Sequence, residues 1–168
     1  VLAKLAVYLP LDAGTRRMLE DHAPRGRVFD LRLGWKGDAD ILTAFSINAR
    51  FEALGRRALG YYPGFDGLYG RIDGSEKGGT VEVSGRNAII ELPTVFADPR
   101  LALAELKGQA SWKAKDGRID VHFQNLAFNN LDATGSASGR YRSDPSGPGE
   151  IDITANLSRA DGAAVRRY

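Results

Sequence analysis

Few side chains in this sequence belong to the types that carry out catalysis or bind metals. The chain has no cysteine and only two histidines, His22 and His122. His122 falls on the polar side of an alternating pattern, which indicates a solvent-facing strand residue, and His22 ends a predicted helix, where a positive charge suits the helix dipole. Asp38 and Asp40 fall in a predicted turn, which is more typical of a solvated loop than of a calcium site.

The sequence also contains no local motif of a known catalytic or metal centre. HExxH, CxxC, GxSxG and phosphate-loop patterns are all absent from the chain. No nucleophile, base and acid follow one another in a recognisable order. We therefore predict that the protein is not an enzyme and uses neither a metal nor a cofactor.

The amino-acid composition excludes several other classes of protein. The 168 residues are 43% hydrophobic, and 23 Lys and Arg are nearly balanced by 21 Asp and Glu. That apolar fraction excludes intrinsic disorder, the lack of a basic block argues against nucleic-acid binding, and no apolar run is long enough to span a membrane as a helix. The chain starts at Val1 and not at Met. We expect a single segment, residues 1–168, of a longer repeat protein.

Apolar and polar residues alternate along most of the chain. Between residues 29 and 35, for example, Phe29, Leu31, Leu33 and Trp35 alternate with polar residues and a glycine. Since successive side chains of a strand point to opposite faces, the pattern predicts strands with one apolar and one wet face. The residues predicted to share the apolar face are Phe29, Leu31, Leu33, Trp35, Phe45, Ile47, Phe51, Leu68, Ile72, Val81, Val83, Ile90, Leu106, Trp112, Val121, Phe123, Leu131, Ile151, Ile153 and Leu157.

Turn signals between these runs predict about nine strands in an antiparallel meander over residues 26–158. Short turns are expected at 76–79, 84–87, 115–117 and 129–130, and a longer loop at 143–149. The alternation slips by one residue after Phe123, which predicts a β-bulge near Gln124 and Asn125. Helical patterns are confined to a helix over 11–23 and the start of another over 160–168.

Two short helices cannot cover so many one-sided strands. The apolar face must therefore be hidden in a sandwich, in a closed barrel, or in a curled sheet whose groove is filled by a ligand. Periodicity does not choose among these, but glycine occupies the apolar parity at several positions, which permits strong bending. These glycines are Gly70, Gly74, Gly108, Gly135 and Gly139. Relief of crowding at the corner of a closed barrel or sandwich is the alternative explanation for them.

An ordered set of short motifs resembles one protein family across nearly the whole chain. The motifs are Tyr-Leu-Pro-Leu at 8–11, Leu-Arg-Leu-Gly-Trp at 31–35, Pro-Gly-Phe-Asp-Gly-Leu at 63–68, Glu-Leu-Pro-Thr-Val-Phe at 91–96 and Leu-Ser-Arg-Ala-Asp at 157–161. In this order they resemble the YhdP group of AsmA-like proteins from Gram-negative bacteria. None of these motifs is catalytic.

The resemblance implies a strongly curved, groove-like β-sheet, comparable to a half-open barrel, with a short helix at each end. It also implies a periplasmic protein anchored to the inner membrane by a part not present here. Such a segment would shield phospholipid acyl chains during transport between the inner and outer membranes, next to flanking repeats of the same chain. The alternative is a closed sandwich or barrel that acts as a structural or ligand-binding module without a lipid conduit.

Overall fold

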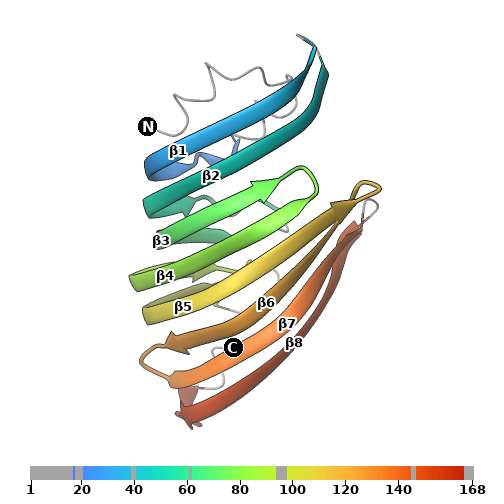
Figure 1. Ribbon diagram of the computed structural model, residues 1–168. Helices are drawn as coiled ribbons and strands as arrows, with labels where there is room; N and C mark the ends of the chain where they lie inside the picture. Colours follow the sequence, from blue (N-terminus) through green and yellow to red (C-terminus); the bar gives the residue numbers. More distant parts are fainter. Residues whose placement is uncertain are drawn as a thin grey trace.

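The computed structural model describes residues 17, 21–38, 41–60, 62–93, 98–144 and 147–164. These residues form one antiparallel sheet in which each strand pairs with the next along the chain (Figure 1). The eight strands are β1 (Arg25–Asp38), β2 (Ile41–Arg56), β3 (Gly64–Ser75), β4 (Gly78–Glu91), β5 (Arg100–Lys115), β6 (Arg118–Asn129), β7 (Ala133–Asp144) and β8 (Gly147–Ala160). The predicted meander is confirmed.

One predicted turn is wrong, and it accounts for the difference between nine expected strands and eight observed ones. Residues 84–87 lie inside the continuous strand β4. Asn87 has a positive φ of 54°, and the β3–β4 register shifts between Asp66 and Leu68. Asparagine tolerates this left-handed conformation, so the backbone makes a bulge here and the strand continues.

Other local predictions are correct. Asp116 and Gly117 join β5 to β6 with φ values of 52° and 73°, as the two central residues of a type I′ hairpin turn require. Asn125 has a φ of 50°, and the register shifts between Phe123 and Leu126 confirm the predicted bulge. The predicted 143–149 loop is shorter than expected, because β7 reaches Asp144 and β8 begins at Gly147.

The two predicted helices fall largely outside the described residues. Within 11–23, Arg17, Asp21 and His22 have helical backbone. At the other end, Ala160 belongs to β8 and not to a helix. A single turn follows, in which the backbone N–H of Ala163 donates to Oδ1 of Asp161 at 2.9 Å.

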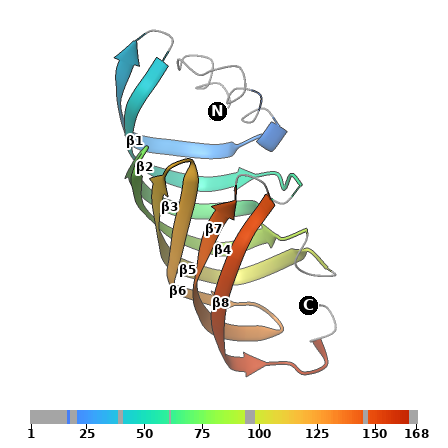
Figure 2. The same cartoon turned by 90° about the vertical axis from the view of Figure 1, so that its right-hand side faces the viewer.

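Left-handed residues on neighbouring strands form a crease across the first half of the sheet. Ala53 on β2 has a φ of 48°, Gly67 on β3 a φ of 75°, and Asn87 on β4 a φ of 54°. All three interrupt the pairing register between their strands or adjoin such an interruption. Because bulges bend strands and increase their twist, the strands curve strongly along their length (Figure 2). The sheet therefore has one concave and one convex face.

Within the described residues the sheet remains unclosed. β1 and β8 are its two edges and do not pair with each other, and a second sheet is not formed by these residues. The prediction of a curled, half-open sheet is confirmed, whereas the closed barrel or sandwich is not what the described strands form. The hydrophobic core is correspondingly small: Phe51, Leu68 and Ala88 form one buried cluster beside the crease.

A candidate apolar groove

The strand register places apolar side chains in continuous rows on the concave face. One row crosses the sheet from Ile47 on β2 through Gly74, Gly79 and Trp112 to Val121 on β6. A neighbouring row is formed by Ala49, Ile72, Val81, Ala110, Phe123, Gly139 and Ile153. Paired residues of adjacent strands point to the same face, so each row is an uninterrupted apolar strip.

Two inward glycines of β3, Gly74 in the first row and Gly70 in a third row with Phe51 and Val83, lie beneath large side chains from neighbouring strands. A Cβ atom added to Gly74 would lie 2.5 Å from Cζ2 of Trp112, and one added to Gly70 would lie 2.8 Å from Cζ of Phe51. At these two positions an aromatic ring lies where a side chain of the glycine would stand. Apolar side chains therefore cover the concave face in a single layer.

Solvent exposure of the concave face increases toward the edges of the sheet. Phe51 and Leu68 beside the crease are 5% and 8% exposed, whereas Trp35 near the tip of the β1–β2 hairpin is 59% exposed. On the edge strand β8, Ile151 and Ile153 are 62% and 52% exposed. Large apolar side chains in contact with water over a contiguous face mark a surface that binds something apolar.

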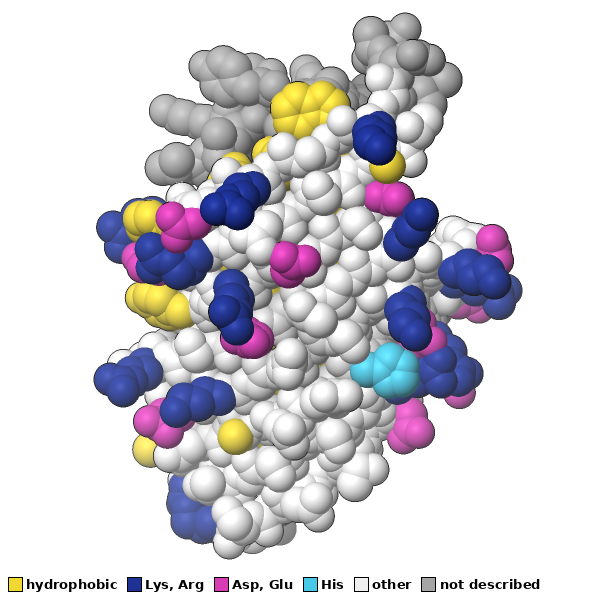
Figure 3. All heavy atoms as spheres, in the orientation of Figure 1, with side chains coloured by type: hydrophobic (Ala, Val, Ile, Leu, Met, Phe, Trp, Pro, Cys, Tyr) yellow, Lys and Arg dark blue, Asp and Glu magenta, His cyan; other side chains and the backbone are white. Residues whose placement is uncertain are grey.

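The convex face is polar and carries charged residues of both signs across the strands (Figure 3). Its ion pairs include Arg71 on β3 with Glu82 on β4 at 2.9 Å, and Arg50 with Glu52 at 3.0 Å along β2. A shallow depression of about 700 Å³ lies among these side chains. Because its two arginines already contact carboxylates, we assign no ligand to it.

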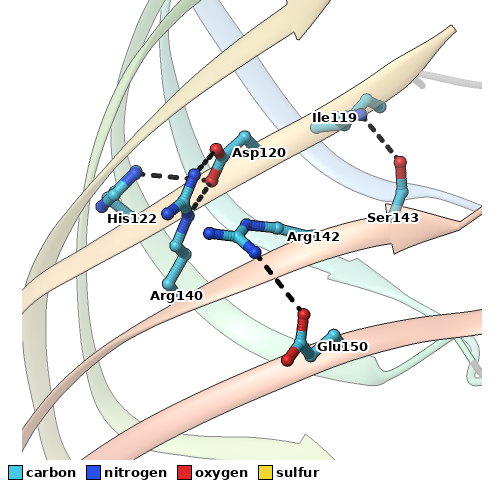
Figure 4. Close-up of polar contacts among 7 residues, drawn as sticks. All are labelled: Ile119, Asp120, His122, Arg140, Arg142, Ser143 and Glu150. Carbon is cyan, nitrogen blue, oxygen red and sulfur yellow. Dashed lines mark hydrogen bonds and ion pairs between the residues drawn. The ribbon is translucent and has the colours of Figure 1, made fainter.

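A second charged cluster lies on β6, β7 and β8 (Figure 4). The Nε atom of Arg140 donates to Oδ1 of Asp120 at 2.6 Å, Nη2 of Arg140 also contacts that carboxylate, and Nε2 of His122 lies 3.4 Å from it. The hydrogen bond from Arg140 lowers the pKa of Asp120 below its usual value. Arg142 pairs with Glu150 at 3.6 Å. These contacts tie neighbouring strands together on the wet side of the sheet.

The structure brings most of the predicted apolar-face residues together on the concave face. By pairing register or contact with the buried cluster, they are Leu33, Trp35, Phe45, Ile47, Phe51, Leu68, Ile72, Val81, Val83, Ile90, Leu106, Trp112, Val121, Phe123, Ile151, Ile153 and Leu157.

Phe29 was predicted on the same face, and this prediction is wrong. Phe29 pairs with Arg50, and the Arg50 guanidinium lies 4.8 Å from the centre of the Phe29 ring, on the charged face. The cause is a bulge at Asp30, which has a φ of 53°, and at Leu31: both residues stand opposite Ala49 alone. One extra residue inverts the parity of everything before it.

Leu131 also differs from its predicted position. It lies in the turn between β6 and β7 and is 92% exposed, so it belongs to no row of the concave face. Asn130 makes this turn, because its Oδ1 accepts hydrogen bonds from the backbone N–H groups of Asp132 and Ala133. A turn was predicted at 129–130, but it covers residues 130–132, so Leu131 lies outside the strand although the alternation in the sequence continues through it.

The structure adds apolar residues that the parity argument had omitted. Val28 pairs with Phe51 and takes the inward position in place of its neighbour Phe29. Leu54 and Phe65 pack against the buried cluster, and Leu103 is itself buried opposite Ala88. The alternation of Leu101 and Leu103 could have extended the predicted strand toward its observed start at Arg100. For the other added residues, bulges interrupt the alternation that would have predicted them.

The two histidines form no metal site with their described surroundings. His22 is buried and its ring contacts Tyr62 edge-on, with 5.5 Å between the ring centres, while His122 is paired with Asp120. Across the described residues, no three His, Asp or Glu side chains are grouped as metal ligands would be. Asp40 of the predicted acidic turn lies outside the described residues. No described helix is long and apolar enough to cross a membrane.

Fold and surface together define a class: proteins in which a single curled β-sheet presents an apolar trough on one side and a charged surface on the other. Within that class, the chain belongs to the YhdP protein family, whose model matches residues 1–168. The family is associated with lipid transport and is not known as a family of enzymes. No curated protein matches the sequence. No solved structure matches it.

Proposed function

We propose that the concave face binds the acyl chains of phospholipids and shields them from water during transport between the inner and outer membranes. The observation that carries the proposal is an apolar face that the described chain leaves open, with Trp35 and Ile151 more than half exposed at its two ends. Membership of the YhdP family supports a lipid as the apolar partner.

The energetic argument follows from the size of an acyl chain. Exposing one CH₂ group to water costs about 0.8 kcal/mol, so a sixteen-carbon chain costs on the order of 12 kcal/mol. A continuous apolar strip lowers this barrier at every point of the path. Such a strip needs surface and no catalytic group.

In this proposal the charged convex face remains in contact with water. Its ion pairs, such as Arg71 with Glu82, keep the convex side hydrated and prevent acyl chains from binding there. The lipid head group stays in water at the open side of the trough. We place the protein in the periplasm, anchored to the inner membrane through another part of the full-length protein, with flanking repeats extending the trough.

Site-specific photo-crosslinking tests the proposal with adjacent pairs of positions. A benzophenone side chain replaces Phe45 or Ile153 on the concave face, or their neighbours Ser46 or Thr154 on the convex face. Positions 45 and 153 are expected to capture phospholipid that carries a radioactive or fluorescent acyl chain, and positions 46 and 154 are not. Equal capture by both faces, or none by either, would show that the concave face does not bind lipid.

A second experiment identifies lipid that the protein itself retains. The protein is purified without detergent, and its extract is analysed by mass spectrometry. Phospholipid is expected in the wild type and at a lower amount in an Ile153→Lys variant, which places a charge on the apolar strip. A wild-type protein that carries no lipid and takes none up from vesicles would refute the proposed function.

A further inference from the structure

Trp112 has an unusual position on the concave face. It lies on β5, pairs with Gly79 on β4, and reaches as far as Gly74 on β3. Atoms Cζ2 and Cη2 of the indole lie 2.5 and 2.8 Å from where a Cβ of residue 74 would stand, and Cη2 lies 2.6 Å from that of residue 79. Adjacent strands are about 4.8 Å apart, so a side chain of β5 reaches β3 only by extending along the sheet.

The two glycines are what allow this position. Gly74 pairs with Gly79, so neighbouring strands offer no side chain at this point of the row. The benzo edge of the indole fills the space of both absent side chains. Ile47 precedes them in the same row and Val121 follows Trp112, so the strip stays apolar on either side.

We infer that Trp112 sets the depth of the trough at this row and that Gly74 and Gly79 keep the indole down against the sheet. The inference rests on the proposed function, and it assigns a specific residue the control of passage. An indole that extends along the sheet adds little height, whereas an indole that stands away from the sheet obstructs an acyl chain.

Gly74 offers the sharpest test of the pair. A Cβ at position 79 would collide with the backbone atoms of Asp73 and Gly74, so a substitution there disturbs the strand itself. At position 74 the close atoms belong to the Trp112 ring, and the nearest backbone atom, O of Gly78, is 3.4 Å away. Gly74→Ala is therefore expected to lift the indole and leave the pairing of β3 intact.

The experiment measures binding of a phospholipid with a fluorophore on one acyl chain, presented in phosphatidylethanolamine and phosphatidylglycerol vesicles, to the full chain. Gly74→Ala is expected to weaken binding about tenfold, which corresponds to about 1.4 kcal/mol. Gly147→Ala is the matched control, because a Cβ there would meet nothing within 4 Å. The double variant Gly74→Ala with Trp112→Ala is expected to recover wild-type binding. Far-UV circular dichroism checks that each variant retains its strands.

The outcomes separate the inference from the function on which it rests. If wild type binds the probe and Gly74→Ala binds equally well, or if the double variant stays weak, the role of Trp112 is refuted while the proposed function stands. If wild type does not bind, the proposed function fails, and the inference fails with it.

A spectroscopic measurement keeps the inference testable should Gly74→Ala fail to fold. Trp35 and Trp112 are the only tryptophans of the chain, so Trp35→Phe leaves a single indole. Phospholipid with bromine atoms on its acyl chains is expected to quench that fluorescence, because Trp112 lines the path. Binding of the brominated lipid without quenching would place Trp112 away from the acyl chain and overturn the inference.

Discussion

The ring of Phe51 on β2 covers Gly70 on β3, the residue with which it pairs across the two strands. Both lie in the row that continues to Val83 and Gly108. A Cβ at position 70 would collide with the backbone carbonyl of Glu82 as well as with the Phe51 ring. The close approach of three strands at this point thus depends on the absence of one methyl group.

Gly70→Ala is therefore expected to destabilise the protein by about 2–3 kcal/mol, since overpacking here forces backbone atoms to move. Urea unfolding followed by circular dichroism gives the change in the free energy of unfolding. Gly147→Ala, at an open position, serves as the control and is expected to leave stability nearly unchanged. Equal effects at both positions would contradict the packing explanation.

Truncation of apolar residues should distinguish the buried part of the concave face from its open part. Phe51→Ala removes a 5% exposed ring and is expected to cost about 3 kcal/mol of stability. Trp35→Ala removes a ring that is 59% exposed and is expected to cost less than about 1 kcal/mol. The same urea experiment measures both, and a large loss at position 35 would show that the chain itself covers this surface.

The bulge at Asp30 makes a prediction about two adjacent residues of β1. A photo-crosslinker at position 28 is expected to capture lipid, and one at position 29 is not, because Val28 faces the trough and Phe29 faces the charged side. Mass spectrometry of the crosslinked peptides reads the result. Capture at position 29 and not at position 28 would mean that Phe29 faces the trough and would contradict the bulge at Asp30.

Acid is expected to weaken the sheet through its cross-strand carboxylates. Hydrogen bonds from Arg25 to Asp66, and from Arg140 to Asp120, lower the pKa of each carboxyl below its usual value of 3.8. A depressed folded-state pKa contributes stability above the unfolded pKa, and this is lost as the pH falls below about 4. Thermal unfolding is measured at pH 7 and pH 3, and the unfolding temperature is expected to be lower at pH 3. This difference in unfolding temperature should be smaller in the Asp66→Asn variant.

The exposed edge of β8 is expected to cause self-association of the isolated chain. Among the described strands β8 is an edge of the sheet, and with Ile151 and Ile153 more than half exposed it can add to another sheet. Light scattering over a concentration series should show species larger than a monomer, and Ile153→Lys should reduce them. A wild-type chain that stays monomeric throughout would disprove this.

Alternation predicted the meander and the composition of the faces well, particularly in β5 to β8. Gly139 and Ile153, for instance, share a face as the period of two requires. The turn at Asp116 and Gly117 was also predictable from its turn residues, and the bulge at Asn125 from the slip of the alternation after Phe123. Candidate groove residues were therefore predictable wherever the strand stayed regular.

Positive φ angles at several residues other than glycine could not be predicted from the sequence. Asp30 and Ala53 adopt positive φ without being glycine, and the first of these moves Phe29 to the charged face. Asn87 has a residue type typical of a turn but stands in the interior of β4. In each case the residue stands at or next to a shift of the pairing register with a neighbouring strand, which a local pattern of residue types does not reveal.

By itself, the sequence determined that the chain forms antiparallel strands with one apolar side, since side-chain direction in a strand follows residue number. It also determined where glycines leave room on that side. Only the tertiary structure decided that the eight described strands form an open sheet, and that Trp112 occupies the space above Gly74. Whether a sheet closes into a barrel depends on the combined twist and bulges of all its strands, and no single stretch of sequence determines that combination.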